Sequence, residues 1–119
     1  MIHVVAIITA KPGKRDEILK NFKANVPAVH AEKGCIEYGA TIDTDGGPFA
    51  KFGPDTFVVI EKWESMDDLK AHGASAHMKA YGEKNKDLVA NRAVTLQVCA
   101  ARPSGRVVER VVAAHGKGG

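Results

Sequence analysis

The sequence has little cysteine, few aromatic residues and no long run of hydrophobic side chains. Its two cysteines, Cys35 and Cys99, lie far apart and form no CxxC or zinc-type spacing, so reduced thiols are expected rather than a redox pair or a zinc ribbon. Aromatic residues make up 6% of the 119 residues, too few for a surface that stacks on nucleic-acid bases. No apolar stretch is long enough to span a bilayer.

The sequence also has no segment in which charge of one sign is concentrated. The chain carries 17 Lys and Arg against 14 Asp and Glu, a formal net charge of +3, and its basic residues are scattered. We interpret this charge as favouring solubility, not nucleic-acid binding. The apolar start, residues 1–8, has no basic leader and no cleavage site. These features predict a cytoplasmic protein without a nucleic-acid or membrane partner.

The hydrophobic patterns predict one α+β domain. Alternation of side chains indicates strands over residues 2–10, 36–42, 56–64 and 92–100. Apolar residues at steps of three and four indicate a helix over residues 14–32. Pro27 should kink or shorten this helix, and Gly34 is expected to end it. Shorter helices follow Ser65 and span residues 76–89. The order is β-α-β-β-α-β, a ferredoxin-like arrangement with a four-stranded antiparallel sheet.

We expect the domain to cover residues 1–100 and a C-terminal extension to cover 101–119. The extension begins at a Pro-Ser-Gly break, shows a helical spacing of valines and ends in a glycine-rich stretch that we expect to be disordered. Residues 43–55 form a loop rich in Gly, Pro and Asp that is longer than an ordinary hairpin turn.

One face of such a sheet is left uncovered by the helices. In the strand over 56–64, the side chains of Phe57, Val59, Glu61 and Trp63 share a face. We expect the uncovered face to carry Phe57, Val59 and Trp63, together with one side of the first strand. An apolar patch of that size predicts a partner surface, and the simplest partner is a second copy related by a two-fold axis.

Three stretches resemble the antibiotic biosynthesis monooxygenase (ABM) family. Residues 61–72, EKWESMDDLKAH, look like its E-x-W followed by a short helix ending in His. Residues 74–81, ASAHMKAY, resemble its S-x-H-F-x-x-F, with Met78 and Tyr81 at the aromatic places. Residues 32–38, EKGCIEY, are similar to its E-P-G-C-x-x-Y. The match covers roughly residues 2–100 and implies a homodimer of ferredoxin-like domains, a dimeric α/β barrel with a cavity in each subunit.

The family does not fix one reaction. It includes quinol and polyketide monooxygenases that use no metal or flavin, haem-degrading enzymes, isomerases and members without known activity. Some cofactor-free oxygenases carry an Asn four residues before the strand Trp, where this chain has Val59. The haem-degrading branch uses an Asn on the first strand, a Trp and a His, where this chain has Ala6 or Ile7, His72 and Gly82. Haem degradation is therefore disfavoured.

Four residues are candidate catalytic groups. His72 is the first choice for a base because imidazole titrates near neutral pH, and His77 is the second. Glu61 either pairs with a cation across a dimer or is a carboxyl with a raised pKa that handles protons. Trp63 either packs in a core or lines a pocket.

The remaining site predictions concern substrate binding, metal and thiol. The candidate substrate-binding residues are Phe57, Val59, Tyr81 and Tyr38. We expect no metal site, since His72 and His77 lie five residues apart, about 140° around a helix, and residues 73–75 break that helix. No cofactor is expected. Cys35 is interpreted as a buried, unreactive thiol.

The leading hypothesis is a cofactor-independent monooxygenase acting on a small aromatic or quinol with oxygen. In this hypothesis His72 takes a proton, Trp63 stacks on the ring, Glu61 or His77 orients or donates, and Phe57 and Val59 form the wall of the pocket. Two alternatives stay open. One is an isomerase of a small oxygenated metabolite that uses the same acid and base, and the other is a non-catalytic dimer that binds a hydrophobic ligand.

Overall fold

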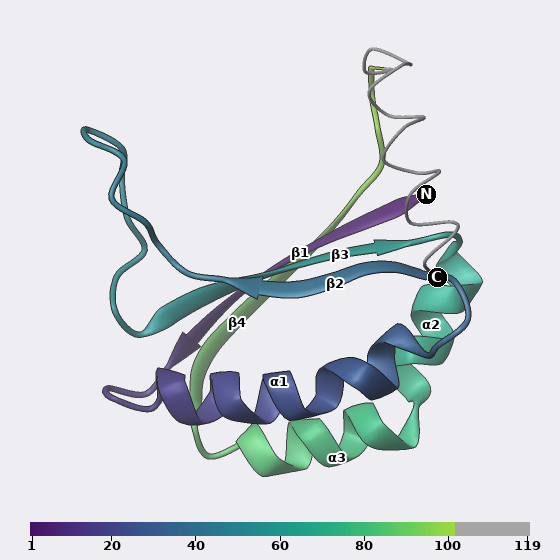
Figure 1. Cartoon of the computed structure of the whole chain (residues 1–119), viewed down its shortest axis with the longest axis horizontal. Coiled ribbons are helices and arrows are strands. Elements are labelled where there is room, and N and C mark those ends of the chain that lie inside the picture. The colour runs from purple at the N-terminus through teal and green to yellow at the C-terminus, as the bar shows by residue number, and fades with distance from the viewer. Residues whose placement is uncertain (102–119) are drawn as a thin grey trace.

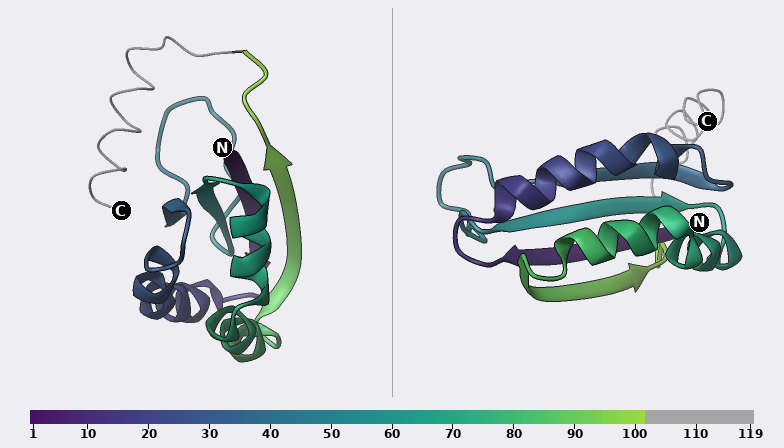
Figure 2. Two further views of the ribbon diagram at one scale, coloured as in Figure 1. Left: turned by 90° about the vertical axis from the view of Figure 1, so that its right-hand side faces the viewer. Right: turned by 90° about the horizontal axis from the view of Figure 1, so that it is seen from below.

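The computed structural model describes residues 1–101, and the predicted extension lies outside them apart from its first residue. Four antiparallel strands form one sheet in the order β2-β3-β1-β4, and three helices lie along one side of it (Figures 1 and 2). The elements are β1 (Ile2–Ala10), α1 (Arg15–His30), β2 (Cys35–Thr41), β3 (Thr56–Trp63), α2 (Met66–Ala74), α3 (Ala76–Asn85) and β4 (Val89–Gln97). The predicted α+β ferredoxin-like fold is confirmed, with its second helical region divided in two.

The ends of the elements differ from prediction by a few residues. α1 runs through Pro27 for three further residues and ends at His30, so Gly34 is not its stop. Gly34 instead has a φ of 80° in the turn that leads into β2, a backbone conformation that favours glycine. α3 ends at Asn85 rather than residue 89, and β4 begins at Val89 rather than residue 92. Ser65 caps α2 as predicted, with its Oγ accepting from the Asp68 amide at 3.1 Å.

The strand faces are assigned by the register of the sheet. β1 pairs with both β3 and β4, and its Val4, Ala6 and Ile8 share the helical side with Glu61, Val59 and Phe57 of β3. The prediction that Phe57, Val59 and Trp63 lie on the uncovered face was wrong, because all three are buried in the core beneath the helices. The uncovered face carries Val5, Ile7, Val58 and Ile60 instead, all half-buried.

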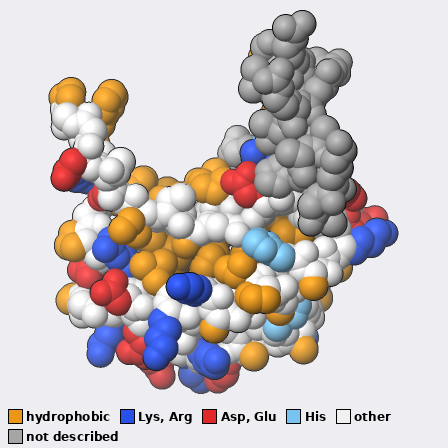
Figure 3. Space-filling view, viewed as in Figure 1, with side chains coloured by type: hydrophobic (Ala, Val, Ile, Leu, Met, Phe, Trp, Pro, Cys, Tyr) orange, Lys and Arg blue, Asp and Glu red, His pale blue; other side chains and the backbone are white. Residues whose placement is uncertain are grey.

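The helices cover the sheet unevenly. α1 packs on β1 and β2, and α2 packs on β3, whereas α3 packs mainly on α1 and α2. Phe22 of α1 stacks on Tyr38 of β2 with ring centroids 4.7 Å apart and meets Phe57 edge-on. Because α3 is held by the other helices, a hollow remains between it and the strands β1 and β4. Charged side chains of both signs are scattered over the helical part of the molecule, in the lower half of the view (Figure 3).

The loop over residues 43–55 rises from the end of the sheet, away from the helices (Figures 1 and 2). Asp43 closes its base by accepting from the amides of Phe52 and Gly53 at 3.2 and 2.8 Å. These backbone hydrogen bonds lower the pKa of Asp43. Phe49 and Phe52 are 77% and 59% exposed on the loop. Within residues 1–101, no helix has both the length and the apolar character needed to cross a membrane.

Candidate active site

The hollow between the sheet and the helices is a cavity of about 570 Å³. That volume lies in the range of small-molecule sites. Its wall is mainly apolar and includes Val94 and Leu96 of β4, which remain 44% and 48% exposed. The side chains that line it are contributed by every helix and by all four strands, among them Val4, Ala6, Ile8, Ile18, Phe22, Tyr38, Val59, Glu61, Leu69, His72, Met78, Tyr81, Asn85, Lys86, Val89, Arg92, Val94 and Leu96.

His72 lies at this wall in the last turn of α2 and is 5% exposed. Ser75 fixes the end of that helix, because its Oγ donates to the carbonyl oxygen of His72 at 2.7 Å. The imidazole packs between aromatic rings, 4.6 Å from the Trp63 ring centroid and 5.6 Å from that of Tyr38. Of the five histidines in the chain, the predicted first-choice base is thus a buried residue at the cavity wall.

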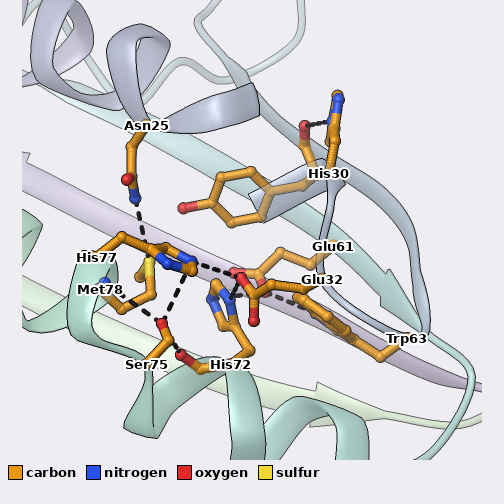
Figure 4. A network of polar contacts seen from close by, with 10 residues as sticks. Asn25, His30, Glu32, Glu61, Trp63, His72, Ser75, His77 and Met78 are labelled. Atoms are coloured by element: carbon orange, nitrogen blue, oxygen red, sulfur yellow. Dashed lines mark hydrogen bonds and ion pairs between the residues drawn. The ribbon is translucent and has the colours of Figure 1, made fainter. Parts of the chain in front are cut away.

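Glu32, which follows α1, joins His72 to His77 (Figure 4). Its Oε2 accepts from His72 Nδ1 at 2.8 Å and from His77 Nε2 at 2.9 Å. The argument that His72 and His77 point apart was therefore wrong. α2 ends at Ala74 and α3 starts afresh at Ala76, so the break redirects His77 toward the same carboxylate instead of separating the pair.

Glu61 reaches the cavity from β3 beside His72. Its Oε1 accepts from Trp63 Nε1 at 2.9 Å and lies 3.9 Å from His72 Nε2. Burial raises the pKa of Glu61, while the Trp63 hydrogen bond and the nearby His72 and Arg92 act in the opposite direction. The prediction of a cross-dimer cation stays untested, and within residues 1–101 the carboxyl has a neutral donor, a histidine and the cation of Arg92 acting on it.

Three of the predicted site residues do not line the cavity. Trp63 has no exposed surface and lies behind Glu61 and His72, so it cannot stack on a bound ring without a rearrangement of the core. Phe57, 1% exposed, is covered by Phe22. His77 faces Glu32 with its side chain 30% exposed. Val59, Tyr38 and Tyr81 do line the cavity as predicted.

The two tyrosines present hydroxyl groups that stay protonated. Burial raises the pKa of Tyr81 to about 12, although Arg92 and Asn85 act against that rise. Burial, followed by the charge of Glu61, also raises the pKa of Tyr38. At neutral pH both hydroxyls therefore keep their proton and remain uncharged hydrogen-bond donors at the wall of the cavity.

Sequence reasoning missed four polar residues of the site. Asn85, Lys86 and Arg92 line the end of the cavity nearest β4, and Asn85 is held by the Asn21 amide at 2.8 Å. The fourth is Glu32, which lies within a motif quoted for the family resemblance but was not singled out. Because its partners are 40 and 45 residues away, only the folded structure brings them together.

The same cluster contains the atoms that a metal ion would need. Glu32, His72 and His77 each offer one ligand atom, all within 4.8 Å of one another. Two imidazoles and a carboxylate suit several divalent transition metals. In the structure these same atoms are joined by hydrogen bonds of normal length, and the expectation that no metal binds here stays a prediction.

Cys35 is half-buried at the start of β2, close to this cluster. Burial raises the pKa of its thiol to about 11, with the charges of Glu32 and Glu61 adding to the effect. A thiol that stays protonated at neutral pH is a poor nucleophile and a poor metal ligand. The interpretation of Cys35 as unreactive agrees with this position.

Known proteins share these motifs and this fold. A sequence profile of the family described as antibiotic biosynthesis monooxygenase matches residues 1–84. The chain is 42% identical over 89 residues to "Probable quinol monooxygenase YgiN" of Escherichia coli K12, covering 72% of this chain and 86% of that protein.

Solved structures share the fold. PA3566 from Pseudomonas aeruginosa has a TM-score of 0.71 at 25% identity, covering 84% of this chain and 94% of that one. Rv0793 from Mycobacterium tuberculosis has a TM-score of 0.71 at 24% identity, covering 87% and 98%. With the profile match and the 42% identical relative, these findings lead to one conclusion: the chain belongs to the antibiotic biosynthesis monooxygenase family, which places it among the monooxygenases.

Proposed function

We propose that this protein is a cofactor-independent monooxygenase that oxidises a small electron-rich aromatic, such as a quinol, in the 570 Å³ cavity. The observation that carries the proposal is the placement of His72. His72 lines the cavity together with Glu61, its Nε2 lies 3.9 Å from Glu61 Oε1, and its Nδ1 is hydrogen-bonded to Glu32, which does not line the cavity. The relative named as a quinol monooxygenase supports the substrate class.

The chemistry asked of the protein is proton transfer in a water-poor pocket. His72 removes the proton of a substrate hydroxyl, and the resulting anion is electron-rich enough to pass an electron to O₂ itself. One oxygen atom then bonds to a ring carbon, and the other leaves as water, so that a quinol and O₂ give a hydroxyquinone and H₂O. Tyr38 and Tyr81 line the cavity, and in this scheme their hydroxyls donate to the oxygens on which negative charge develops.

Glu61 has a supporting role in this scheme. Because burial raises its pKa, it can hold a proton next to His72 and return it to the product or to the departing oxygen. Trp63, without exposed surface, acts through its hydrogen bond to Glu61 and as the wall against which His72 packs. This replaces the stacking role expected of Trp63 from the sequence.

The experiment is oxygen uptake with a panel of quinols and metal-free protein, followed by mass spectrometry of product made under ¹⁸O₂. We expect one labelled oxygen per product and a loss of about 10²-fold or more in kcat for His72→Ala. Lys70→Ala, which removes an exposed side chain of the same helix α2 outside the cavity, is the matched control. Full activity of His72→Ala would remove His72 from the role of base.

Two other outcomes would point to the alternatives. Conversion of a substrate without oxygen consumption would indicate an isomerase that uses His72 and Glu61 as base and acid. Saturable binding of quinols with no product under air would indicate a ligand-binding protein. Both outcomes would overturn the monooxygenase proposal.

We also propose that the protein works as a homodimer. The uncovered sheet face carries Val5, Ile7, Val58 and Ile60 at its centre, and the loop over 43–55 extends beyond the same side of the sheet with exposed Phe49 and Phe52. An apolar strip of this kind is costly in water and suits a self-complementary surface.

A further inference from the structure

We propose that Glu32 is a positioning residue that fixes the tautomer and orientation of His72. The inference rests on the proposed function for its catalytic meaning, because it explains how the base is prepared. Nothing in the cavity itself requires Glu32, which is absent from the residues that line it. Its effect on the reaction must therefore pass through the imidazole.

The contact itself determines which ring nitrogen carries the proton. An ionised carboxylate can only accept hydrogen bonds. The 2.8 Å contact between Glu32 Oε2 and His72 Nδ1 therefore places a hydrogen on Nδ1. In the neutral imidazole the lone pair must then lie on Nε2, the nitrogen on the side of Glu61, which is a residue of the cavity wall. The opposite tautomer would present a hydrogen to the substrate hydroxyl and could not act as a base.

Backbone hydrogen bonds hold Glu32 to residues before it and after it in the chain. Its amide donates to the carbonyl of Val29 at 3.0 Å, and its own carbonyl accepts from the Cys35 amide at 3.3 Å. Two residues on, the Gly34 carbonyl accepts from the Glu64 amide at 2.9 Å, which ties the turn to the end of β3. The side chain is 14% exposed, so water screens its charge only in part.

His77 makes the arrangement stiffer. Its Nε2 donates to the same oxygen as His72 at 2.9 Å, so that two donors on two helices fix one carboxylate oxygen. The other charged or titratable groups near His72 are Glu61 on β3, Tyr38 and Cys35 on β2, and Arg92 on β4, whose charge reaches Glu61. Of these, Glu61 faces Nε2, and none is hydrogen-bonded to Nδ1.

The proton count of the step is simple. The substrate O–H bond breaks, an N–H bond forms at His72 Nε2, and the Nδ1–H bond remains intact. The imidazolium formed in this way carries one positive charge, which the Glu32 carboxylate offsets at hydrogen-bond distance. Glu32 therefore favours proton transfer twice, through the tautomer before the step and through the charge after it.

The test uses full-length Glu32→Ala and Glu32→Gln, with Glu17→Gln on the exposed side of α1 as the matched control. Ring ¹⁵N shifts of labelled histidine, assigned with His72→Gln, report which nitrogen of His72 is protonated. Steady-state kinetics separate kcat from KM. Glu32→Gln keeps an acceptor of similar shape without charge. It is the second test variant, for use if the smaller alanine disturbs the turn.

We expect wild type and Glu17→Gln to show His72 protonated at Nδ1, and Glu32→Ala to shift the proton toward Nε2. In Glu32→Ala kcat should fall by about 10²-fold to 10⁴-fold, as expected for loss of an oriented general base, with KM little changed. For Glu32→Gln we expect a tautomer population and a kcat between those of wild type and Glu32→Ala. An unchanged His72 tautomer in both folded variants would overturn the inference, as would a loss confined to KM. If wild type turns over no quinol while the tautomer still shifts, the proposed function fails and the hold of Glu32 on His72 stands.

Discussion

At the scale of single residues, the protonation of Glu61 is linked to the stability of the fold. Burial raises its pKa above the value of an exposed carboxyl, so folding favours the protonated form. The stability that Glu61 contributes is therefore complete below about pH 4.3, the ordinary Glu value. It is lost as the pH rises through the higher pKa of the folded state.

The substitution Glu61→Gln tests this sign. The amide can still accept from Trp63 Nε1 but carries no charge, so we expect a higher Tm than wild type at pH 8 and a difference that shrinks as the pH falls toward 4. Thermal melts followed by circular dichroism across that range measure it. A variant less stable than wild type at pH 8 would show that the charge of Glu61 is well compensated. Catalytic activity should fall in either case.

The ligand-like cluster of Glu32, His72 and His77 gives a second prediction at this scale. Because hydrogen bonds satisfy the imidazole donors, we expect dialysis against a strong chelator to leave oxygen uptake unchanged. Metal content by elemental analysis before and after dialysis is the control. Loss of activity that returns with one particular divalent ion would identify the cluster as a metal site.

Whether a residue of the site can be predicted from the sequence depends on how far it lies along the chain from the residues it contacts. The His72, Glu61 and Trp63 group could be predicted because its members lie within one strand and the next helix. Glu32 could not be singled out, since only the folded turn after α1 brings it to His72. The stacking role of Trp63 failed because alternation along a strand says which side chains share a face. It does not say how deep beneath the cavity wall a side chain lies.

At the scale of elements, the turn between α1 and β2 depends on a glycine. Gly34 has a φ of 80°, and a Cβ built there would lie 2.7 Å from the Asp68 Cβ and 2.1 Å from its Oδ2. The turn thus packs directly against the first turn of α2, the helix that carries His72. Any side chain at this position would push the two apart.

Gly34→Ala should therefore destabilise the protein by about 3 kcal/mol, combining strained backbone with overpacking. Gly13→Ala is a matched control, because Gly13 has a φ of 77° but nothing within 4 Å of the added Cβ. The control should cost about 1 kcal/mol from backbone strain alone. Urea unfolding of both variants gives the two values. Equal losses would mean that the contact with Asp68 relaxes without cost.

The order of the elements could be predicted well, and their ends less so. Side-chain periodicity located all four strands and the three helices. Gly34 was taken as the stop of the first helix because glycine often ends helices, yet the helix ends at His30, with Ala31 as its cap residue. The glycine is required by the later turn and by its close approach to α2, a tertiary contact that leaves no periodic mark in the sequence.

At the scale of the whole molecule, the uncovered sheet face predicts self-association. Ile60→Lys places a charge at the centre of that face, so we expect light scattering after size exclusion to change from twice the chain mass to the chain mass. Ala80→Lys adds the same charge on the exposed side of α3 and should leave the mass at that of a dimer. A wild-type protein that elutes as a monomer at high concentration would contradict the proposed dimer.

The existence of an apolar uncovered face was foreseen from the sequence, but its residues were not. Both faces of β1 and β3 are apolar near their centres, so composition gives no preference for either side. The helices settle the matter by packing on the face with the larger side chains, Phe57 and Trp63. The smaller Val5, Ile7, Val58 and Ile60 are left outside.

The buried position of Trp63 gives the protein an optical reporter. It is the single tryptophan of the chain. Its indole lies against the imidazole of His72, with the two ring centroids 4.6 Å apart. Since a protonated imidazole quenches indole fluorescence, emission excited at the indole band should report the charge of His72 without any label. Molecules that enter the cavity and touch His72 should change that emission, so a simple titration in a cuvette can screen for the natural substrate.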